Sequence, residues 1–346
     1  SDLKERERTG IKTMKIKYNR VFGYSLEITN TFKDLVPDNY IRKQTLTNAE
    51  RYITQELKEL EDLILGAEDK LYALEYELFC DVRDTVGKEV MRIQKTAKAV
   101  AALDVFASLA LVAERNHFVR PKTNTTGVID IKNGRHPVVE QMIENDMFIA
   151  NDTYLDNQKK RVSIITGPNM AGKSTYMRQT ALIVLMAQIG SFVPADSVRM
   201  GIIDKIFTRV GASDNISMGE STFMVEMTET ANILHNADEW SLVLMDEVGR
   251  GTSTFDGLAL AWAIARALIE HNRAYTLFAT HYFELTRLAA EYPMVANVHL
   301  AALEHKDKIV FLHHVKDGPA SRSYGLQVAS LAGWSRCARA HWAVWH

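Results

Sequence analysis

A phosphate-binding motif in the middle of the chain constrains its fold more than any other feature. Residues 167–174 read Gly-Pro-Asn-Met-Ala-Gly-Lys-Ser and match the pattern G-x-x-x-x-G-K-S in full. The apolar run at 161–166 predicts a buried strand, and residues 176–189 predict the helix that follows. In this order of strand, loop and helix, backbone N–H groups surround the phosphates, Lys173 reaches the outer phosphates and Ser174 binds magnesium. The motif therefore predicts a nucleoside triphosphate site rather than a fortuitous turn.

Length and composition narrow the class of protein. The 346 residues, 47% of them hydrophobic, are enough for about two or three domains with at least one full core. The net charge of −2 shows no basic excess over the whole chain, so any contact with nucleic acid must be local. Two cysteines without metal-ligand spacing favour a reducing compartment, and we expect a cytoplasmic protein. No apolar run approaches the roughly 18 residues of a membrane span, so we expect no membrane partner.

Residues 1–45 carry the pattern of a β-hairpin. Polar and apolar side chains alternate through residues 15–18 and again through 24–28, with a turn at 19–23 between them. Lys and Arg outnumber Asp and Glu in this segment. Two interpretations stay open: a solvated strand face, or a contact with a nucleic-acid phosphate backbone that would be nonspecific and sensitive to salt. The charged opening without methionine also indicates that the sequence is a piece of a longer chain.

Residues 46–120 change to a helical pattern. Apolar side chains recur at alternating steps of four and three, as in a helix that pairs with another helix. The positions are Ile53, Leu57, Leu60, Ile64, Ala67, Leu71, Leu74 and Leu78. A short break at 81–84 predicts an antiparallel helix pair, which would either transmit motion to the nucleotide site or serve a purely architectural role.

Residues 121–333 alternate strand and helix patterns and predict an α/β domain with a parallel-rich sheet. The expected core strands are 162–166, 242–245, 275–279 and 309–315. The expected helices are 174–189, 222–236 and 256–270. Residues 334–346 hold three of the five tryptophans, and this abrupt change in composition favours a frame-shifted or cloning-derived tail over an aromatic binding tail.

Two adjacent carboxylates follow a buried strand. Residues 241–245 are the strand, and Asp246 and Glu247 stand at its end. Asp246 can hold magnesium together with Ser174, while Glu247 can polarise the attacking water. His281 also follows a strand, and ligands of parallel sheets gather outside the carboxyl ends of the strands. The glycine- and hydroxyl-rich segment 248–257 fits either a loop against another backbone or a plain connection in which Asp256 caps the next helix.

Together these motifs resemble the MutS family of DNA mismatch-repair ATPases over residues 1 to about 333. The sequence motifs that carry the resemblance begin at Thr166, Ser221, Asp246 and Ala279. Further similar motifs are Gly134-Arg-His-Pro and Ser323-Tyr-Gly-Leu-Gln-Val-Ala. The resemblance implies an ABC-type P-loop ATPase domain (121–333) preceded by core and lever helices (46–120) and a partial DNA clamp (1–45).

The resemblance also implies roles for single residues. The nucleotide would be bound by the loop Gly167, Pro168, Asn169, Met170, Ala171, Gly172, Lys173, Ser174 and Thr175, and the adenine would lie between Phe148 and His313. Ser221 would reach the γ-phosphate on the opposite subunit of a homodimer, the 249–257 loop would cross between the two sites, and His281 would sense that phosphate. DNA-contact candidates are Lys15, Lys17, Asn19 and Arg20.

The implied activity is hydrolysis of ATP with magnesium, coupled to clamping of mismatched double-stranded DNA and to downstream repair proteins. The family reads mismatches with a Phe-x-Glu element, and none occurs in this sequence, so we expect the mismatch-reading domain to be absent. Two alternatives remain: an ATP-gated structural module of ABC type without a mismatch role, and an inactive truncated remnant.

Overall fold

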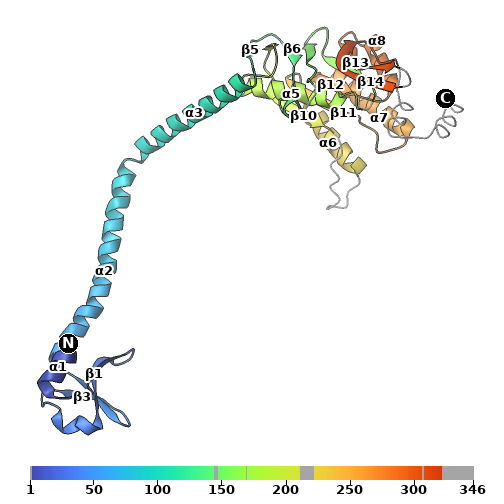
Figure 1. The fold of residues 1–346 in the computed structure, drawn as a ribbon. Coiled ribbons are helices and arrows are strands. Elements are labelled where there is room, and N and C mark those ends of the chain that lie inside the picture. Colours follow the sequence, from blue (N-terminus) through green and yellow to red (C-terminus); the bar gives the residue numbers. More distant parts are fainter. Residues whose placement is uncertain (1, 144–146, 169, 211–221, 306–307, 322–346) are drawn as a thin grey trace. The chain divides into compact units, whose positions relative to one another are not determined.

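The computed structural model describes residues 2–143, 147–168, 170–210, 222–305 and 308–321, and within these ranges the side chains of 303–310 are left out. The chain forms two compact units, residues 1–101 and 102–346 (Figure 1). The expected tail at 334–346 lies outside the described residues.

The first unit is built on a four-stranded antiparallel sheet. After helix α1 (Asp2–Thr9) come β1 (Lys15–Asn19), β2 (Gly23–Thr29), the short helix η1 (Asn30–Leu35), β3 (Ile41–Thr45) and β4 (Ala49–Ile53). The strand order is β1-β2-β4-β3. The predicted hairpin is confirmed, since β1 and β2 pair from Lys15 opposite Glu27 to Asn19 opposite Gly23. The sheet also runs past the expected boundary at residue 45, because β4 lies in its middle.

Local chemistry explains the hairpin turn and the core of this sheet. The side-chain oxygen of Asn19 accepts hydrogen bonds from the backbone N–H groups of Val21 (2.8 Å) and Phe22 (3.2 Å), which closes the turn. Gly23 follows with φ +72°, a left-handed value that glycine adopts without strain. Alternate residues of β2 point inward, and Leu26 and Ile28 are buried in a core with Ile11, Met14, Tyr40, Tyr52 and Leu57.

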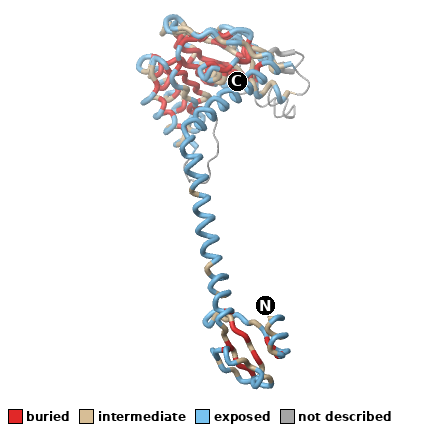
Figure 2. Tube along the Cα trace, turned by 90° about the vertical axis from the view of Figure 1, so that its left-hand side faces the viewer, coloured by how far each residue is buried: buried red, intermediate tan, exposed pale blue. Residues whose placement is uncertain are grey.

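Two long helices follow, and their break differs from the prediction. Helix α2 (Gln55–Lys88) starts at the cap Thr54, whose hydroxyl accepts from the N–H of Leu57, and α3 (Val90–Arg115) begins after Glu89. The expected break at 81–84 was wrong, and so was the helical start before residue 55. Within the first unit the predicted antiparallel packing of the two helices is not found, because no residue of α2 after Leu57 and no residue of α3 up to position 101 is buried. Figure 2 shows most of the length of α2 as exposed, and the exposed residues include Leu60, Ile64, Leu71, Leu74 and Leu78 of its apolar seam.

Helix α3 bears on the expectation that the sequence contains no membrane span. By length and composition alone, α3 could cross a membrane. Only 6% of its most apolar 18-residue stretch is buried. Lys98 and Asp104 divide its apolar stretch, so no continuous apolar run appears in the sequence. A single helix of this length and composition is weak evidence for a membrane span, and the property by itself does not assign α3 to a membrane.

The second unit contains a six-stranded sheet of order β10-β11-β12-β8-β13-β14. Its strands are β8 (Val162–Thr166), β10 (Lys205–Arg209), β11 (Ser241–Asp246), β12 (Tyr275–Ala279), β13 (Val295–His305) and β14 (Lys308–Asp317). All neighbours are parallel except β13 and β14, which confirms the predicted parallel-rich sheet. The carboxyl ends of β8, β11 and β12 consequently meet at one edge.

A smaller sheet of order β5-β9-β6-β7 completes the strands of this unit. Its strands are β5 (Lys122–Thr123), β6 (Val128–Gly134), β7 (Asn151–Asp156) and β9 (Ser197–Met200). The helices are α4 (Val139–Met142), α5 (Lys173–Gln188), α6 (Thr222–Asn236), α7 (Thr254–Ala267), the π-turn η3 (Leu268–Asn272), η4 (Phe283–Arg287) and α8 (Leu288–Glu291).

Two hydrophobic cores cover the two faces of the six-stranded sheet. Consecutive residues of β8 point to opposite faces, so Ile165 packs with α5 and the smaller sheet, while Ile164 packs with α6, α7 and α8. Both side chains are fully buried, as are Leu244 and Met245 on β11. This two-sided burial explains the continuous apolar runs in the sequence and fixes the strand ends that carry the site.

Candidate nucleotide site

The loop between β8 and α5 has the backbone of a phosphate-binding loop. Gly167 (φ +139°), Met170 (φ +71°) and Gly172 (φ +99°) have positive φ angles, and α5 begins at Lys173. An added Cβ on Gly167 would lie 3.1 Å from the carbonyl oxygen of Leu300, so glycine also allows the loop to pass close to β13. The loop N–H groups and the start of α5 thus stand at the strand edge, where anions bind to helix N-termini.

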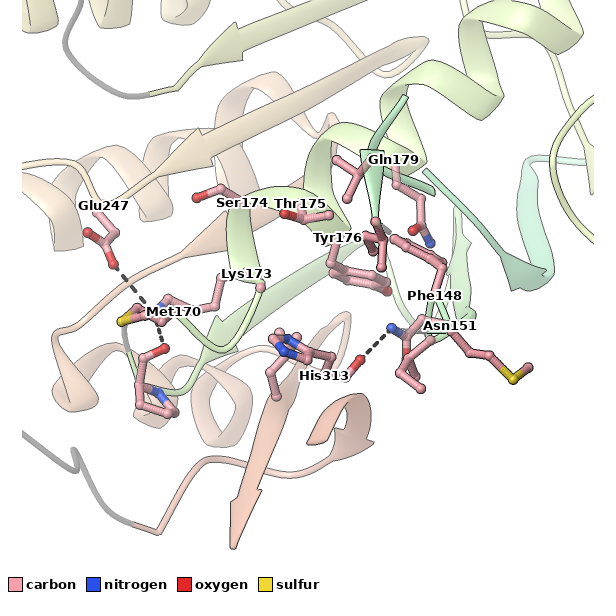
Figure 3. Close-up of a pocket in the computed structure, with 17 residues that line it drawn as sticks. Phe148, Asn151, Met170, Lys173, Ser174, Thr175, Tyr176, Gln179, Glu247 and His313 are labelled. Carbon is pink, nitrogen blue, oxygen red and sulfur yellow. Dashed lines mark hydrogen bonds and ion pairs between the residues drawn. The ribbon is translucent and has the colours of Figure 1, made fainter. Parts of the chain in front are cut away.

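Lys173 lies inside this loop. Its Nζ donates to the carbonyl oxygens of Gly167 (2.8 Å) and Pro168 (3.3 Å) and forms an ion pair with Oε1 of Glu247 at 3.4 Å (Figure 3). Burial lowers the pKa of Lys173, and the Glu247 carboxylate opposes that shift. The ammonium group is therefore held in place by three oxygens before any phosphate binds.

Ser174 and Asp246 bring the two halves of the motif set together. The Ser174 hydroxyl donates to Oδ2 of Asp246 at 2.5 Å, across the edge between α5 and β11. Burial raises the pKa of Asp246, and the hydrogen bond from Ser174 opposes this shift. A hydroxyl and a carboxylate fit magnesium, which takes oxygen ligands and is often held by one or two carboxylates and substrate phosphates. Among the described residues no three or more His, Cys, Asp or Glu side chains are grouped so that they could hold a metal ion.

Glu247 points away from the strand direction because its backbone is left-handed, with φ +52°. Its N–H donates to the carbonyl oxygen of Ala279 at 2.9 Å, which fixes the turn to β12. Its second carboxylate oxygen accepts a hydrogen bond from Arg250, so Glu247 is held between two cations. Non-glycine residues at positive φ are uncommon and gather at functional sites, and here the conformation turns the carboxylate toward Lys173.

A cavity of about 520 Å³ adjoins the loop (Figure 3). Phe148 and His313 both line it, although they lie in segments far apart in the chain. The other lining residues are Val139, Ile143, Met147, Ile149, Asn151, Pro168, Met170, Gly172, Lys173, Ser174, Thr175, Tyr176, Gln179, Glu247 and Leu300. Phosphate-loop residues thus lie at this cavity together with an aromatic ring and an imidazole. Ala171 is fully buried and does not line the cavity, but its carbonyl oxygen lies 2.9 Å from Nδ1 of His313.

His281 lies two residues beyond β12 and does not line the cavity. Its ring lies 4.0 Å from that of Tyr282, centroid to centroid. Partial burial lowers the pKa of His281, and the charges of Glu247, Arg250 and Lys173 act on its imidazole. The structure therefore places His281 within electrostatic reach of the ion pairs around Glu247.

The loop after Glu247 is held from three sides at Gly249. Its N–H donates to Oε1 of the buried Glu226 at 2.6 Å, and its carbonyl oxygen accepts from the Tyr282 hydroxyl at 3.2 Å. Gly249 has φ +93°, and an added Cβ would lie 2.6 Å from the carbonyl oxygen of Gly257. Glu226 thereby connects α6, which starts directly after Ser221, to the loop that follows Glu247.

The cap of α7 differs from the prediction. The N-cap is Ser253, whose hydroxyl accepts from the N–H of Asp256 and donates to its carboxylate at 2.8 Å. Asp256 therefore sits in the first turn, where its N–H and its carboxylate both bond to the capping hydroxyl of Ser253. Helix α7 accordingly begins at Thr254, two residues before the expected start.

Some residues of the site were not predicted from the sequence, and two predicted residues lie outside the described part of the chain. Asn169 and Ser221 lie outside the described residues. Asn151, Arg250 and Glu226 were not expected in the site. No local pattern marks Asn151, whose partners lie more than 160 positions away in the chain, whereas a charged residue on the apolar face of the 222–236 helix was a usable signal for Glu226.

The DNA-contact candidates lie on the hairpin of the first unit. Lys15, Lys17 and Arg20 are exposed, and the two lysines are two positions apart on β1 and so share one face. Asn19 is only half-buried, and its carboxamide oxygen is already used in the turn. Lys15 and Lys17 are thus the residues of this group whose side chains are free to reach outward from a rigid strand.

Comparison with known proteins matches both units. Residues 163–341 match the model of MutS domain V, and residues 2–70 match that of MutS family domain IV. Similar proteins are three bacterial proteins named DNA mismatch repair protein MutS. Identity is 66% with that of Lachnoclostridium phytofermentans, 58% with that of Alkaliphilus oremlandii and 57% with that of Acetivibrio thermocellus.

These alignments cover 96%, 95% and 96% of the chain. They cover 36%, 37% and 38% of the relatives, so the chain spans little more than a third of the proteins it matches. The matched part is the C-terminal portion, with the ATPase domain preceded by the β region and helices of domain IV. Since the domain V model alone covers more than half of its length, the chain belongs to the MutS family.

Proposed function

We propose that the second unit binds ATP with magnesium and hydrolyses it to ADP and phosphate. The observation that carries the proposal is the meeting of Lys173 and Ser174 with Asp246 and Glu247 at one sheet edge, through contacts of 3.4 and 2.5 Å. The two pairs are separated by 72 positions in the chain, and the parallel order of β8 and β11 around β12 brings them together.

Binding would use the loop and its lysine. The backbone N–H groups of residues 170–175, at the N-terminus of α5, would face the phosphates, and Lys173 would exchange its carbonyl partners for phosphate oxygens. Ser174 and Asp246 hold magnesium, which neutralises charge on the outer phosphates. Phe148 and His313 enclose the adenine, since an aromatic ring and an imidazole both stack on a base.

Hydrolysis needs a group that orients water. In this step a water oxygen bonds to the γ-phosphorus, the bond to the bridging oxygen breaks, and Glu247 accepts the proton that the water loses. The ammonium group of Lys173 forms an ion pair with Glu247 in this structure. Bound phosphates would compete with Glu247 for this ammonium group. Loss of the Lys173 partner would leave Oε1 of Glu247 available to water, while Arg250 keeps its hydrogen bond to Oε2. His281, near the same charges, is proposed to sense the γ-phosphate.

The wider role rests on the relatives, which are named DNA mismatch repair proteins. We propose that two copies of the ATPase unit form a homodimer with two shared sites, in which Ser221 of one copy reaches the γ-phosphate on the other. The first unit would clamp double-stranded DNA, with Lys15 and Lys17 near the phosphate backbone. Downstream repair proteins would respond to the closed state, and the setting would be the cytoplasm.

Two substitutions test the proposed binding and hydrolysis of ATP. Lys173→Ala removes the phosphate-binding charge and should weaken ATP binding about 10- to 100-fold, as expected for hydrogen bonds to a charged group. Glu247→Gln should retain ATP binding and lower turnover by about 10²- to 10⁴-fold. Lys159→Ala and Glu239→Gln change the same residue types at exposed positions and should leave both quantities unchanged. Normal hydrolysis by the Glu247→Gln protein would show that another group orients the water.

Size measurement with and without ATP tests the dimer. Binding of ATP should convert monomer to dimer if the sites are shared. A monomer under both conditions would count against the shared sites and favour the inactive remnant. ATP-driven dimers that show no affinity for DNA would favour a structural module of ABC type.

A further inference from the structure

Asn151 links two segments that line the nucleotide cavity. It is the first residue of β7 and is 5% exposed. Its side-chain Nδ2 donates to the carbonyl oxygen of His313 at 2.9 Å, and its Oδ1 accepts from the N–H of Val315 at 2.9 Å. Figure 3 shows the first of these bonds inside the cavity. A single carboxamide therefore joins the smaller sheet to β14 of the larger one.

The part of β14 that Asn151 holds is irregular. Phe311 pairs with Ala302 and Val315 pairs with Leu300, so the three residues 312–314 stand opposite Ala301 alone. His313 lies in the middle of this bulge and has φ +50°, a left-handed conformation that costs free energy in a non-glycine residue. Backbone groups displaced from a ladder need other partners, and the donor and acceptor of Asn151 supply them as a neighbouring peptide group would.

The bulge places the His313 imidazole at the phosphate loop. Its Nδ1 lies 2.9 Å from the carbonyl oxygen of Ala171. A carbonyl oxygen only accepts, so Nδ1 carries the hydrogen and Nε2 of the neutral ring is left as an acceptor. An added Cβ on Gly172 would lie 3.3 Å from this Nδ1, so the ring fits closely because residue 172 is glycine.

We propose that Asn151 is a positioning residue for the base of the nucleotide. It holds the strained bulge that presents His313, and through the chain it fixes the start of β7, three residues after Phe148. The inference rests on the proposed function, in which Phe148 and His313 enclose adenine. Asn151 acts through these two side chains and contributes to recognition of the base rather than of the phosphates.

The test compares a ligand with a base and one without it. Affinities for ATP and for inorganic tripolyphosphate, both with magnesium, are measured for the full chain and for Asn151→Ala. Loss of the two hydrogen bonds should weaken ATP binding about tenfold and leave tripolyphosphate binding unchanged. His313→Ala should show the same pattern, and the double variant should lose no more than either single variant, because both changes act on one contact.

Two further variants separate positioning from general damage. Asn151→Asp keeps the acceptor for Val315 and loses the donor to His313, so it should weaken ATP binding and spare tripolyphosphate. Thr153→Ala removes a buried hydroxyl of the same strand, bonded to Tyr176 at 3.0 Å and not to β14, and should lower stability without changing the ratio of the two affinities.

Three outcomes would overturn the inference: unchanged ATP affinity in Asn151→Ala, an equal loss for both ligands, or additive losses with His313→Ala. Failure of the proposed function would look different. In that case Lys173→Ala would leave the ATP affinity of the chain unchanged. If Asn151→Ala does not fold, Asn151→Asp is read by the same three outcomes.

Discussion

The hydroxyl of Ser174 donates a hydrogen bond to Oδ2 of Asp246 at 2.5 Å and thereby joins the phosphate loop to the end of β11. The bond places a neutral donor against a carboxylate whose pKa burial raises. The ionised carboxylate of Asp246 therefore lowers the free energy of unfolding. We infer that its role is to bind an ion together with Ser174.

Asp246→Asn should make the ligand-free protein more stable at pH 7. Because the folded state raises the pKa above 3.8, the ionised carboxylate lowers stability at neutral pH, and this penalty disappears as the pH falls through the raised pKa. The gain in thermal midpoint, about 2–4 °C for each kcal/mol in a unit of this size, should shrink on acidification. If the proposed site holds magnesium and ATP, the variant should also lose the rise in midpoint that magnesium and ATP together are expected to give the wild-type protein.

Asp238→Asn is the matched control for that experiment. The hydrogen bond from Lys205 lowers the pKa of Asp238, so the same substitution there should reduce stability at pH 7. Thermal unfolding of the three proteins at pH 7 and pH 4.5 checks both signs. A lower midpoint for Asp246→Asn would contradict the assigned burial cost.

Gly249→Ala should destabilise the protein more than Gly190→Ala. Both glycines have similar positive φ angles, +93° and +87°, so alanine strains the backbone at either by about 1–2 kcal/mol. Only at Gly249 does the new Cβ meet another atom, the Gly257 carbonyl oxygen at 2.6 Å, which should add about 1–3 kcal/mol. Urea unfolding measures the difference, and equal losses would show that the loop can shift.

The stability of the wild-type protein should fall below about pH 6.5 in part through His136. Its Nδ1 accepts from the N–H groups of Val138 (3.2 Å) and Val139 (3.1 Å), and a protonated Nδ1 cannot accept. Burial, with the charge of Arg178, lowers the pKa of His136 from 6.5, so the unfolded state binds the proton first and the free energy of unfolding drops on acidification. His136→Asn keeps an acceptor and should reduce the drop between pH 7.5 and 5.5. Parallel pH profiles for the two proteins would exclude His136 as the cause.

Replacing both Lys15 and Lys17 with alanine should weaken binding to duplex DNA uniformly across sequences. Each lysine that neutralises a phosphate contributes about 0.9 to the slope of log affinity against log salt, so the slope should become shallower. Lys159→Ala removes an exposed lysine from the second unit and should leave the slope unchanged. A slope that does not change in the double variant would remove β1 from the DNA-binding surface.

Local sequence patterns were enough to predict many of the strands, loops and site residues. The Gly-Lys-Ser loop, the buried strand before Asp246 and the apolar strand before His281 are each readable within a few residues, because turn chemistry and burial act locally. The hairpin of β1 and β2 follows from alternation and from the turn at Asn19 for the same reason. Positions on α2 show the limit of such signals, since the apolar seam predicted a helix but not its break at Glu89 or the absence of packing against α3.

Local patterns in the chain already specified a phosphate loop in an α/β sheet and a pair of strand-end carboxylates. The contacts of Glu226 with Gly249, of Arg250 and Lys173 with Glu247, and of Asn151 with the bulge at His313 became visible in the fold alone. These contacts join groups that sheet order and register bring together. A hydrogen bond from Asn151 to a strand more than 160 residues away has no trace in local periodicity.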